Sequence, residues 1–145
     1  MEPEILCENN ILLNVESETQ NETIERVGKL LVQNGYVDEK YIEGMIKRND
    51  DISTYIGNGI AIPHAMSEYI KYIKHSGIVI AQYPCGVDFG EGNTAYLVIG
   101  IAGKNDDHMV ILSKIATTCQ NENNVKKLIK MGSKKDIMEL ILKEE

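Results

Sequence analysis

A nearly continuous apolar run lies in the second half of the chain, Thr94-Ala95-Tyr96-Leu97-Val98-Ile99-Gly100-Ile101, and a shorter one precedes it, Ile78-Val79-Ile80-Ala81. Strands that are apolar on both faces are typical of the centre of a sheet, where other elements cover both sides. The two runs therefore predict central strands, and residues 11–13 are a weaker candidate for a first strand. We expect an α/β fold of the α+β type, with helices packed on both faces of the sheet.

Upstream of these strands the apolar spacing is helical. Ile24 and Val27 follow the polar Thr19 at helical intervals, and Asn34-Gly35 offers the left-handed conformation that often ends a helix. A second helix is predicted from its cap at Asp38 to about residue 50. The first third of the chain is therefore expected to be a helical hairpin.

Turns and further helices are expected around and after the two strands. Residues 83–86 and 90–93 are predicted as turns, the first of them able to close a hairpin. Asp106 is expected to cap a helix in which Val110 and Ile115 face inward. Two more helices are predicted, near residues 125–129 and after the capping-box pattern from Ser133 to Asp136.

Size and charge restrict the possible functions. The chain has 145 residues, 43% of them hydrophobic and 26% charged, so we expect one globular domain over residues 1–145 that folds without a metal or a disulfide. Its net charge is −7, which repels both nucleic-acid backbones and anionic lipid head groups. Neither a nucleic-acid partner nor membrane insertion is expected.

Cysteine usage and the first residues bear on the compartment. Cys7, Cys85 and Cys119 are odd in number and have no C-x-x-C spacing, which favours a reducing compartment over a disulfide framework or a zinc ribbon. The start of the chain is acidic where a signal peptide would be basic. We expect a cytoplasmic protein.

His64 is the first of three histidines and the main candidate for chemistry. It ends a β-prone run that two glycines precede, and Pro63 restricts the backbone just before the imidazole. Neutral imidazole can act as a nucleophile near pH 7. From spacing alone two interpretations remain open: a nucleophile presented at a strand end, or an ordinary hydrogen-bonded loop histidine.

The other candidates are weaker when judged by spacing alone. His108 would lie in the first turn of a helix, where the helix end favours phosphate, but a solvated histidine fits as well. Arg48 could hold phosphate bidentately or be a solvated helix-terminal charge. His75 is interpreted as a surface residue and Cys85 as an unreactive turn residue. A zinc site of three histidines is formally possible, although no two of them have helical spacing.

Two stretches carry a family resemblance. Gly57-Asn58-Gly59-Ile60-Ala61-Ile62-Pro63-His64 resembles the phosphorylation motif of enzyme IIA domains of the bacterial sugar phosphotransferase system, in the mannitol and fructose family. Gln82-Tyr83-Pro84, Gly86-Val87, Phe89-Gly90, residues 97–102 and Lys104-Asn105 with His108 are similar to the mannitol branch. The likeness spans nearly the whole chain. Asn58-Gly59 is closer to fructose-type members, and Ala65 stands where mannitol proteins commonly have glycine.

The resemblance implies a fold and a role. The fold would be a three-layer α/β/α sandwich with a mixed four- to five-stranded sheet. The role would be that of a phosphocarrier, which accepts a phosphoryl group on His64 from the carrier protein HPr and passes it to a cysteine of a sugar permease's IIB domain. His108 matches the family's second active-site histidine, and Arg48 matches an arginine near the same pocket. No cofactor, nucleotide or metal is implied. Docking of both partners is expected on an apolar rim, with Ile60, Ile62 and Met66 as candidates.

Two rival functions remain from the sequence. A regulatory phosphoreceiver of the nitrogen type would also use His64, but it would bind partners according to its phosphorylation state and would not pass phosphate to a permease. A plain interaction domain would require both motif matches to be accidental.

Overall fold

A mixed five-stranded sheet forms the centre of the protein, whose computed structural model describes residues 3–142. The strand order is β1-β4-β5-β3-β2. The strands are β1 (Ile11–Leu12), β2 (Tyr55–Gly57), β3 (Ile60–Ala61), β4 (Gly77–Asp88) and β5 (Thr94–Ala102). β4 and β5 pair antiparallel, while β1 runs parallel to β4 and β3 parallel to β5. The two apolar runs thus form β4 and β5, two adjacent strands inside the sheet, as predicted.

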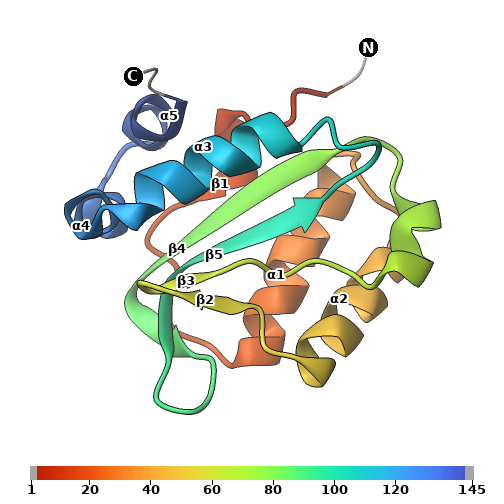
Figure 1. The fold of residues 1–145 in the computed structure, drawn as a ribbon, viewed down its shortest axis with the longest axis horizontal. Helices are drawn as coiled ribbons and strands as arrows, with labels where there is room; N and C mark the ends of the chain where they lie inside the picture. The colour runs from red at the N-terminus through yellow and green to blue at the C-terminus, as the bar shows by residue number, and fades with distance from the viewer. Residues whose placement is uncertain (1–2, 143–145) are drawn as a thin grey trace.

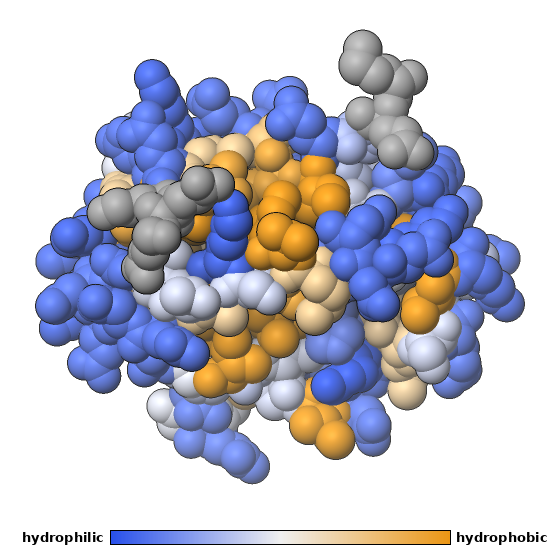
Figure 2. Space-filling model, turned by 45° about the horizontal axis from the view of Figure 1, so that its top comes forward, coloured by the Kyte–Doolittle hydropathy of each residue, from blue (hydrophilic) through white to orange (hydrophobic). Residues whose placement is uncertain are grey.

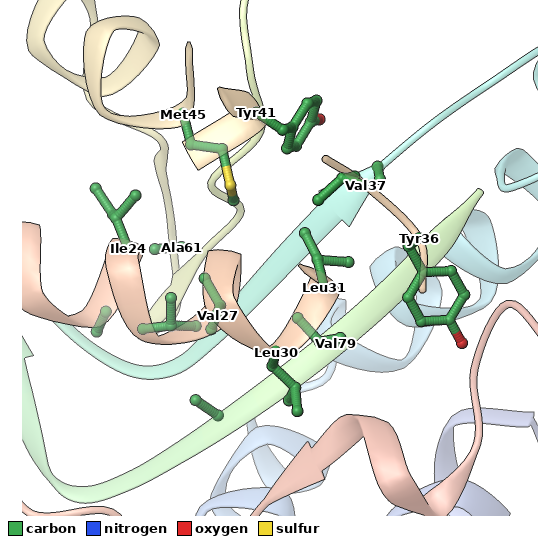
Figure 3. Packing of buried hydrophobic residues seen from close by; sticks show 14 of the residues in the cluster. Ile24, Val27, Leu30, Leu31, Tyr36, Val37, Tyr41, Met45, Ala61 and Val79 are labelled. Atoms are coloured by element: carbon green, nitrogen blue, oxygen red, sulfur yellow. The ribbon is translucent and has the colours of Figure 1, made fainter. Parts of the chain in front are cut away.

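The central strands are buried on both faces. Alternate residues of these strands point into two different hydrophobic clusters, one on each side of the sheet. Val79, Ala81 and Val98 pack in a cluster with the first two helices. Ile80 and Ile99 belong to a second cluster on the other face, with the C-terminal helices. Figure 1 shows the sheet between these two helical layers, and Figure 3 shows α1 and α2 side chains packed over β4 in the first cluster. The expected three-layer α/β/α arrangement is confirmed.

One layer consists of α1 (Gln20–Gln33), α2 (Lys40–Asp51) and the 3-10 helix η2 (Ser67–Tyr72). α1 begins with a capping box, in which Thr19 accepts from the Glu22 amide and the Glu22 carboxylate accepts from the Thr19 amide. It ends at Asn34, followed by Gly35 with φ of +85°. The predicted helical hairpin is therefore present. A shorter 3-10 helix, η1 (Glu8–Asn10), precedes β1.

The opposite layer contains α3 (Met109–Gln120), α4 (Glu122–Lys130) and α5 (Lys134–Leu142). Two predictions about α3 were wrong. Asp106 does not cap it, because Asp106 lies in a left-handed turn with φ of +64° and the helix begins only after His108. Val110 does not face inward either, since it is 67% exposed, whereas Ile115 is buried. Within residues 3–142, no helix is both long enough and apolar enough to cross a membrane.

The predicted hairpin turn at residues 83–86 is a further error. β4 continues through this segment as an irregularity in its pairing with β5, between Gln82 and Val87. Gly86 adopts φ of +83° there, and the chain reverses only at residues 89–93. Residues 83–86 have a composition typical of a turn that reverses the chain. A β-bulge favours the same residue types because it needs the same backbone freedom.

Candidate active site

A cavity of about 350 Å³ opens where β3 and β5 end side by side. Its walls come from α2, η2, the segment after β3, the segment after β5 and the start of α3. The lining residues are Tyr41, Ile62, His64, Ala65, Ile70, Ile73, Ile101, Gly103, His108 and Leu112. Two of the three histidines of the chain therefore meet in one mostly apolar cavity.

Main-chain hydrogen bonds carry the chain from β3 to His64. The Ile62 amide donates to the Thr54 carbonyl at 2.9 Å, and the Ile101 amide donates to the Pro63 carbonyl at 2.9 Å. Pro63 has no amide to donate, so it fits at a position where the ladder is bonded through its carbonyl alone. The segment before His64 is thereby held to β5, and His64 is presented at the end of the sheet.

The His64 ring has a defined tautomer. Its Nδ1 lies 2.8 Å from the carbonyl oxygen of Ile62. A carbonyl oxygen only accepts hydrogen bonds, so this contact requires the proton on Nδ1 in the neutral ring. The lone pair then remains on Nε2, which is the nitrogen that can attack an electrophile.

His108 lies at the N-cap position of α3 and packs against Gly103. A Cβ added at Gly103 would come within 2.2 Å of the His108 Cε1 atom and 2.4 Å of its Nε2 atom. Only glycine therefore leaves room for the ring at this place. His108 Nδ1 is buried and has no hydrogen-bond partner among the described residues. The site thus contains a ring nitrogen whose hydrogen-bonding capacity is unused.

The loop from β5 to His108 is held at its base by Ser76. The Ser76 hydroxyl accepts from the Lys104 amide at 2.7 Å and lies within hydrogen-bond distance of the Lys104 carbonyl and the Asp107 carboxylate. Asn105 and Asp106 both have positive φ, at 57° and 64°. The reversal between them brings α3 back over the sheet, so His108 returns to the end of the strand that the chain has just left.

Tyr41 is a site residue that the sequence interpretation missed. Its hydroxyl donates to the Ile101 carbonyl at 2.7 Å and accepts from the Ala65 amide at 3.2 Å. Burial raises the pKa of Tyr41 to about 12, so the hydroxyl remains a donor at neutral pH. In the sequence Tyr41 is one member of the apolar stripe of α2, and nothing in that pattern distinguishes a site residue from a core residue.

Arg48 and His75 are not among the residues that line this cavity. Arg48 lies in the last turn of α2, where its guanidinium donates to the Ile52 carbonyl at 2.6 Å. His75 is half-buried beside η2, and its amide donates to the Tyr36 carbonyl at 3.1 Å. Between residues 3 and 142, no group of three or more His, Cys, Asp or Glu side chains is arranged to hold a metal ion. The three histidines are therefore not assembled as a zinc site.

Exposed hydrophobic side chains occur on η2 and α3, two of the elements that form the cavity walls. Ile70 of the cavity lining is 46% exposed, and Met109 and Val110, which directly follow His108, are 45% and 67% exposed. Figure 2 shows hydrophobic surface gathered in the middle of the face that α3 crosses, with hydrophilic side chains around it. Ile60 was wrongly expected at this rim, since it is 1% exposed and packs in the core beneath the C-terminal helices. Exposed Cys85 lies on the β4 bulge and does not line the cavity.

Comparison with known proteins identifies the family. The sequence model of the family described as "Phosphoenolpyruvate-dependent sugar phosphotransferase system, EIIA 2" matches residues 4–144. The chain belongs to this family. The match includes the strand end with His64 and the loop that leads to His108. The resemblance inferred from the motifs is confirmed.

Individual relatives agree with the family match. A mannitol-specific phosphotransferase enzyme IIA component of Geobacillus stearothermophilus is 47% identical over 137 residues, which cover 94% of each chain. The crystal structure of IIA mannitol from Escherichia coli has a TM-score of 0.86 at 35% identity, and covers 94% of this chain and 98% of the other. The Escherichia coli complex of enzyme IIAMtl with phosphorylated enzyme IIBMtl matches with a TM-score of 0.89 at 33% identity, covering 96% and 98% of the two chains.

Proposed function

We propose that this enzyme IIA family member is a phosphocarrier that accepts a phosphoryl group on Nε2 of His64 and passes it to a cysteine of a IIB domain. The donor is the phosphorylated histidine of HPr. One observation carries this proposal. The Ile62 carbonyl accepts a hydrogen bond from Nδ1–H of His64, which leaves Nε2 as the nucleophile in the cavity that both histidines line. The placement of both histidines in one cavity supports these residue roles.

The chemistry balances without a cofactor. In the first transfer the Nε2 lone pair attacks phosphorus, an N–P bond forms on His64, and the N–P bond of the donor histidine breaks. The phosphorylated ring carries more positive charge, and its Nδ1–H then donates more strongly to the Ile62 carbonyl. In the second transfer a cysteine thiolate attacks the same phosphorus, and the bonding electrons return to Nε2. The phosphoryl-transfer potential is similar on the donor histidine, on His64 and on the acceptor cysteine.

His108 is proposed to stabilise the phosphoryl group without carrying it. Phosphoryl transfer depends on positioning and on neutralising charge on the three peripheral oxygens. The His108 ring, which lines the cavity, and the positive end of α3 support that role from one wall of the cavity. Arg48 is proposed to add positive charge, which requires its guanidinium to leave the Ile52 carbonyl and reach the phosphate.

Both partners are proposed to dock over the cavity, in contact with exposed hydrophobic side chains of η2 and α3 such as Ile70, Met109 and Val110. A donor and an acceptor must each bring one atom to Nε2 of His64, so they use one surface and compete for it. Apolar side chains at the centre and charged ones around them are typical of such transient interfaces. The mannitol IIA of Escherichia coli, which has the same fold at 33% identity, forms a complex with phosphorylated IIB.

Mannitol is the sugar system that the comparisons favour. The relative at 47% identity is a mannitol-specific component, and this similarity favours onward transfer over a nitrogen-type regulatory role. We also propose that residues 1–145 form one IIA domain and that it acts in the cytoplasm. The family match over residues 4–144 and the three free cysteines support these two points.

The test is a stepwise transfer with purified proteins. The chain is incubated with phosphoenolpyruvate, enzyme I and HPr, and any acid-labile phosphate is mapped to a residue. Isolated phospho-protein is then mixed with a mannitol IIB domain. Phosphate on His64 that moves to the IIB cysteine supports the proposal. Phosphate on another residue contradicts the site, and phosphate that stays on His64 in the presence of IIB favours the regulatory alternative.

A further inference from the structure

The hydrogen bonds around His64 contain one irregularity. β3 and β5 pair in parallel, with Ile60 opposite Leu97 and Ala61 opposite Val98. Continued along the strands, this register puts Ala65 opposite Ala102. In a parallel pair at this spacing, the Pro63 carbonyl accepts from the Ile101 amide, and the next bond joins the Ala65 amide to the Ile101 carbonyl. The first of these bonds is present at 2.9 Å.

The hydroxyl of Tyr41 occupies the position of the next bond. It accepts from the Ala65 amide at 3.2 Å and donates to the Ile101 carbonyl at 2.7 Å, so it lies between the two groups that the ladder would pair. Figure 3 shows Tyr41 reaching from α2 toward the end of β5. A hydroxyl inserted between strands holds them farther apart than a direct bond does. The strands therefore diverge at His64, beside the cavity.

We propose that Tyr41 is a positioning residue for phosphoryl transfer, whose hydroxyl separates the ends of β3 and β5 and so fixes the orientation of the His64 ring in the cavity. The peptide before His64 is bonded to the Ile101 amide, and the peptide after it is bonded through Tyr41 to the Ile101 carbonyl. The peptides on both sides of His64 are therefore held to one residue of β5, Ile101. This inference rests on the proposed role of His64.

The geometry explains why a hydroxyl is needed there. Without it, the Ala65 amide either loses its partner or bonds directly to the Ile101 carbonyl, which draws the segment after His64 toward β5. Either change moves the ring relative to His108. Misplacing a reacting group by about 1 Å can reduce a rate by roughly 10²-fold.

Tyr41→Phe tests the proposal, with Tyr36→Phe as a matched control. Tyr41 and Tyr36 are 2% and 1% exposed, and each hydroxyl both donates and accepts a hydrogen bond. Tyr36 does not line the cavity. We expect Tyr41→Phe to slow phosphorylation of His64 by phospho-HPr by about 10- to 100-fold, with Tyr36→Phe close to the wild-type rate. Equal rates for Tyr41→Phe and wild type would overturn the proposal.

A second measurement reads the geometry without any transfer. The ¹⁵N chemical shifts of the His64 ring report which nitrogen carries the proton, and we expect Tyr41→Phe to lower the Nδ1–H population while Tyr36→Phe leaves it unchanged. Identical shifts in all three proteins would contradict a positioning role. Because the shifts need no phosphate donor, this result is distinguishable from a failure of His64 to be phosphorylated at all.

Hydrogen exchange of the wild-type protein keeps the proposal testable if Tyr41→Phe does not fold. The Ala65 amide is held by the Tyr41 hydroxyl, so its exchange should be slowed to a degree similar to that of the Ile101 amide. Exchange of the Ala65 amide at the rate of an unprotected amide would show that the inserted hydroxyl does not hold the strand end, and would overturn the inference.

Discussion

His64 and His108 line one cavity but are held in different ways. His64 follows a strand and is held by the Pro63 carbonyl bonded to the Ile101 amide, by the Ala65 amide bonded to the Tyr41 hydroxyl, and by a bond from its own ring to Ile62. His108 follows a loop with two left-handed residues, and its buried Nδ1 has no partner among the described residues. This difference supports the proposed division of roles. The ring proposed to carry the phosphoryl group is oriented in advance, whereas the ring proposed to stabilise it has a buried nitrogen without a partner among the described residues.

The largest effect is expected at His64. His64→Ala should accept no phosphate from phospho-HPr, because the nitrogen proposed to attack phosphorus is lost. The measurement is incorporation of labelled phosphate, with His75→Ala as the control that should be phosphorylated like wild type. Phosphate recovered on His108 in the His64→Ala protein would contradict the division of roles between the two rings.

A smaller effect is expected at His108. His108→Ala should still become phosphorylated on His64, but should pass the group to IIB about 10²- to 10³-fold more slowly, the typical loss when one preorganised charge-stabilising donor is removed. Rapid mixing of each half-reaction separates the two steps. If His108→Ala transferred at the wild-type rate, this histidine would be only a helix-end residue.

Gly103 tests whether the position of the His108 ring matters. Gly103→Ala places a Cβ against that ring and should slow onward transfer by about 10- to 100-fold by displacing it. Gly132→Ala is the control, because a Cβ there meets nothing within 4 Å. In a His108→Ala background, Gly103→Ala should have no further effect. Independent, additive losses would show that the two residues act separately.

Arg48 does not line the cavity that holds the two histidines. We expect its substitution to have a weaker effect on the transfer rate. If its guanidinium moves from the Ile52 carbonyl to the phosphate, Arg48→Ala should reduce transfer by about 10-fold, the size of one hydrogen bond to a charged group. Lys47→Ala changes the neighbouring exposed cation and should have little effect on the rate. Equal rates for the two variants would remove Arg48 from the mechanism and leave the cavity residues as the site.

No effect on transfer is expected at Glu18, which lies outside the cavity. The Arg26 guanidinium, 2.6 Å away, lowers the pKa of the Glu18 carboxyl, and a hydrogen bond from Tyr83 adds to this. A depressed pKa contributes stability above the unfolded value, near 4.5, and that stability is lost as pH falls through the folded value. Glu18→Gln should therefore lower the unfolding free energy at pH 7 by at most about 1 kcal/mol.

The Glu18→Gln difference should shrink in acid, below about pH 4.5, as wild type is protonated. Denaturant unfolding across this pH range measures the difference in unfolding free energy between Glu18→Gln and wild type. Transfer rates of the same two proteins are compared at pH 7. A Glu18→Gln protein that folds normally but transfers slowly would show that the site extends beyond the cavity described above.

Local patterns predicted most of the elements and the motif that contains His64. The helix at Gln20–Gln33, the central strands and the reversal after Phe89 each depend on neighbouring residues, so their signals can be read from short windows of sequence. Failures occurred where one composition fits two structures. The composition of residues 83–86 fits a turn and a β-bulge equally well. Asp106 likewise fits a helix cap and a left-handed loop position.

By itself the sequence determined the buried strands, the helices that cover them and the presentation of His64 by a glycine-flanked segment ending in Pro63. The family resemblance also implied that His108 belongs to the site. Tertiary structure alone decided that Gly103 leaves space for the His108 ring and that the Tyr41 hydroxyl lies between Ala65 and Ile101. The physical reason is range. Hydrophobic periodicity and backbone preferences act between near neighbours, whereas strand register and side-chain packing select hydrogen-bond partners from distant parts of the chain.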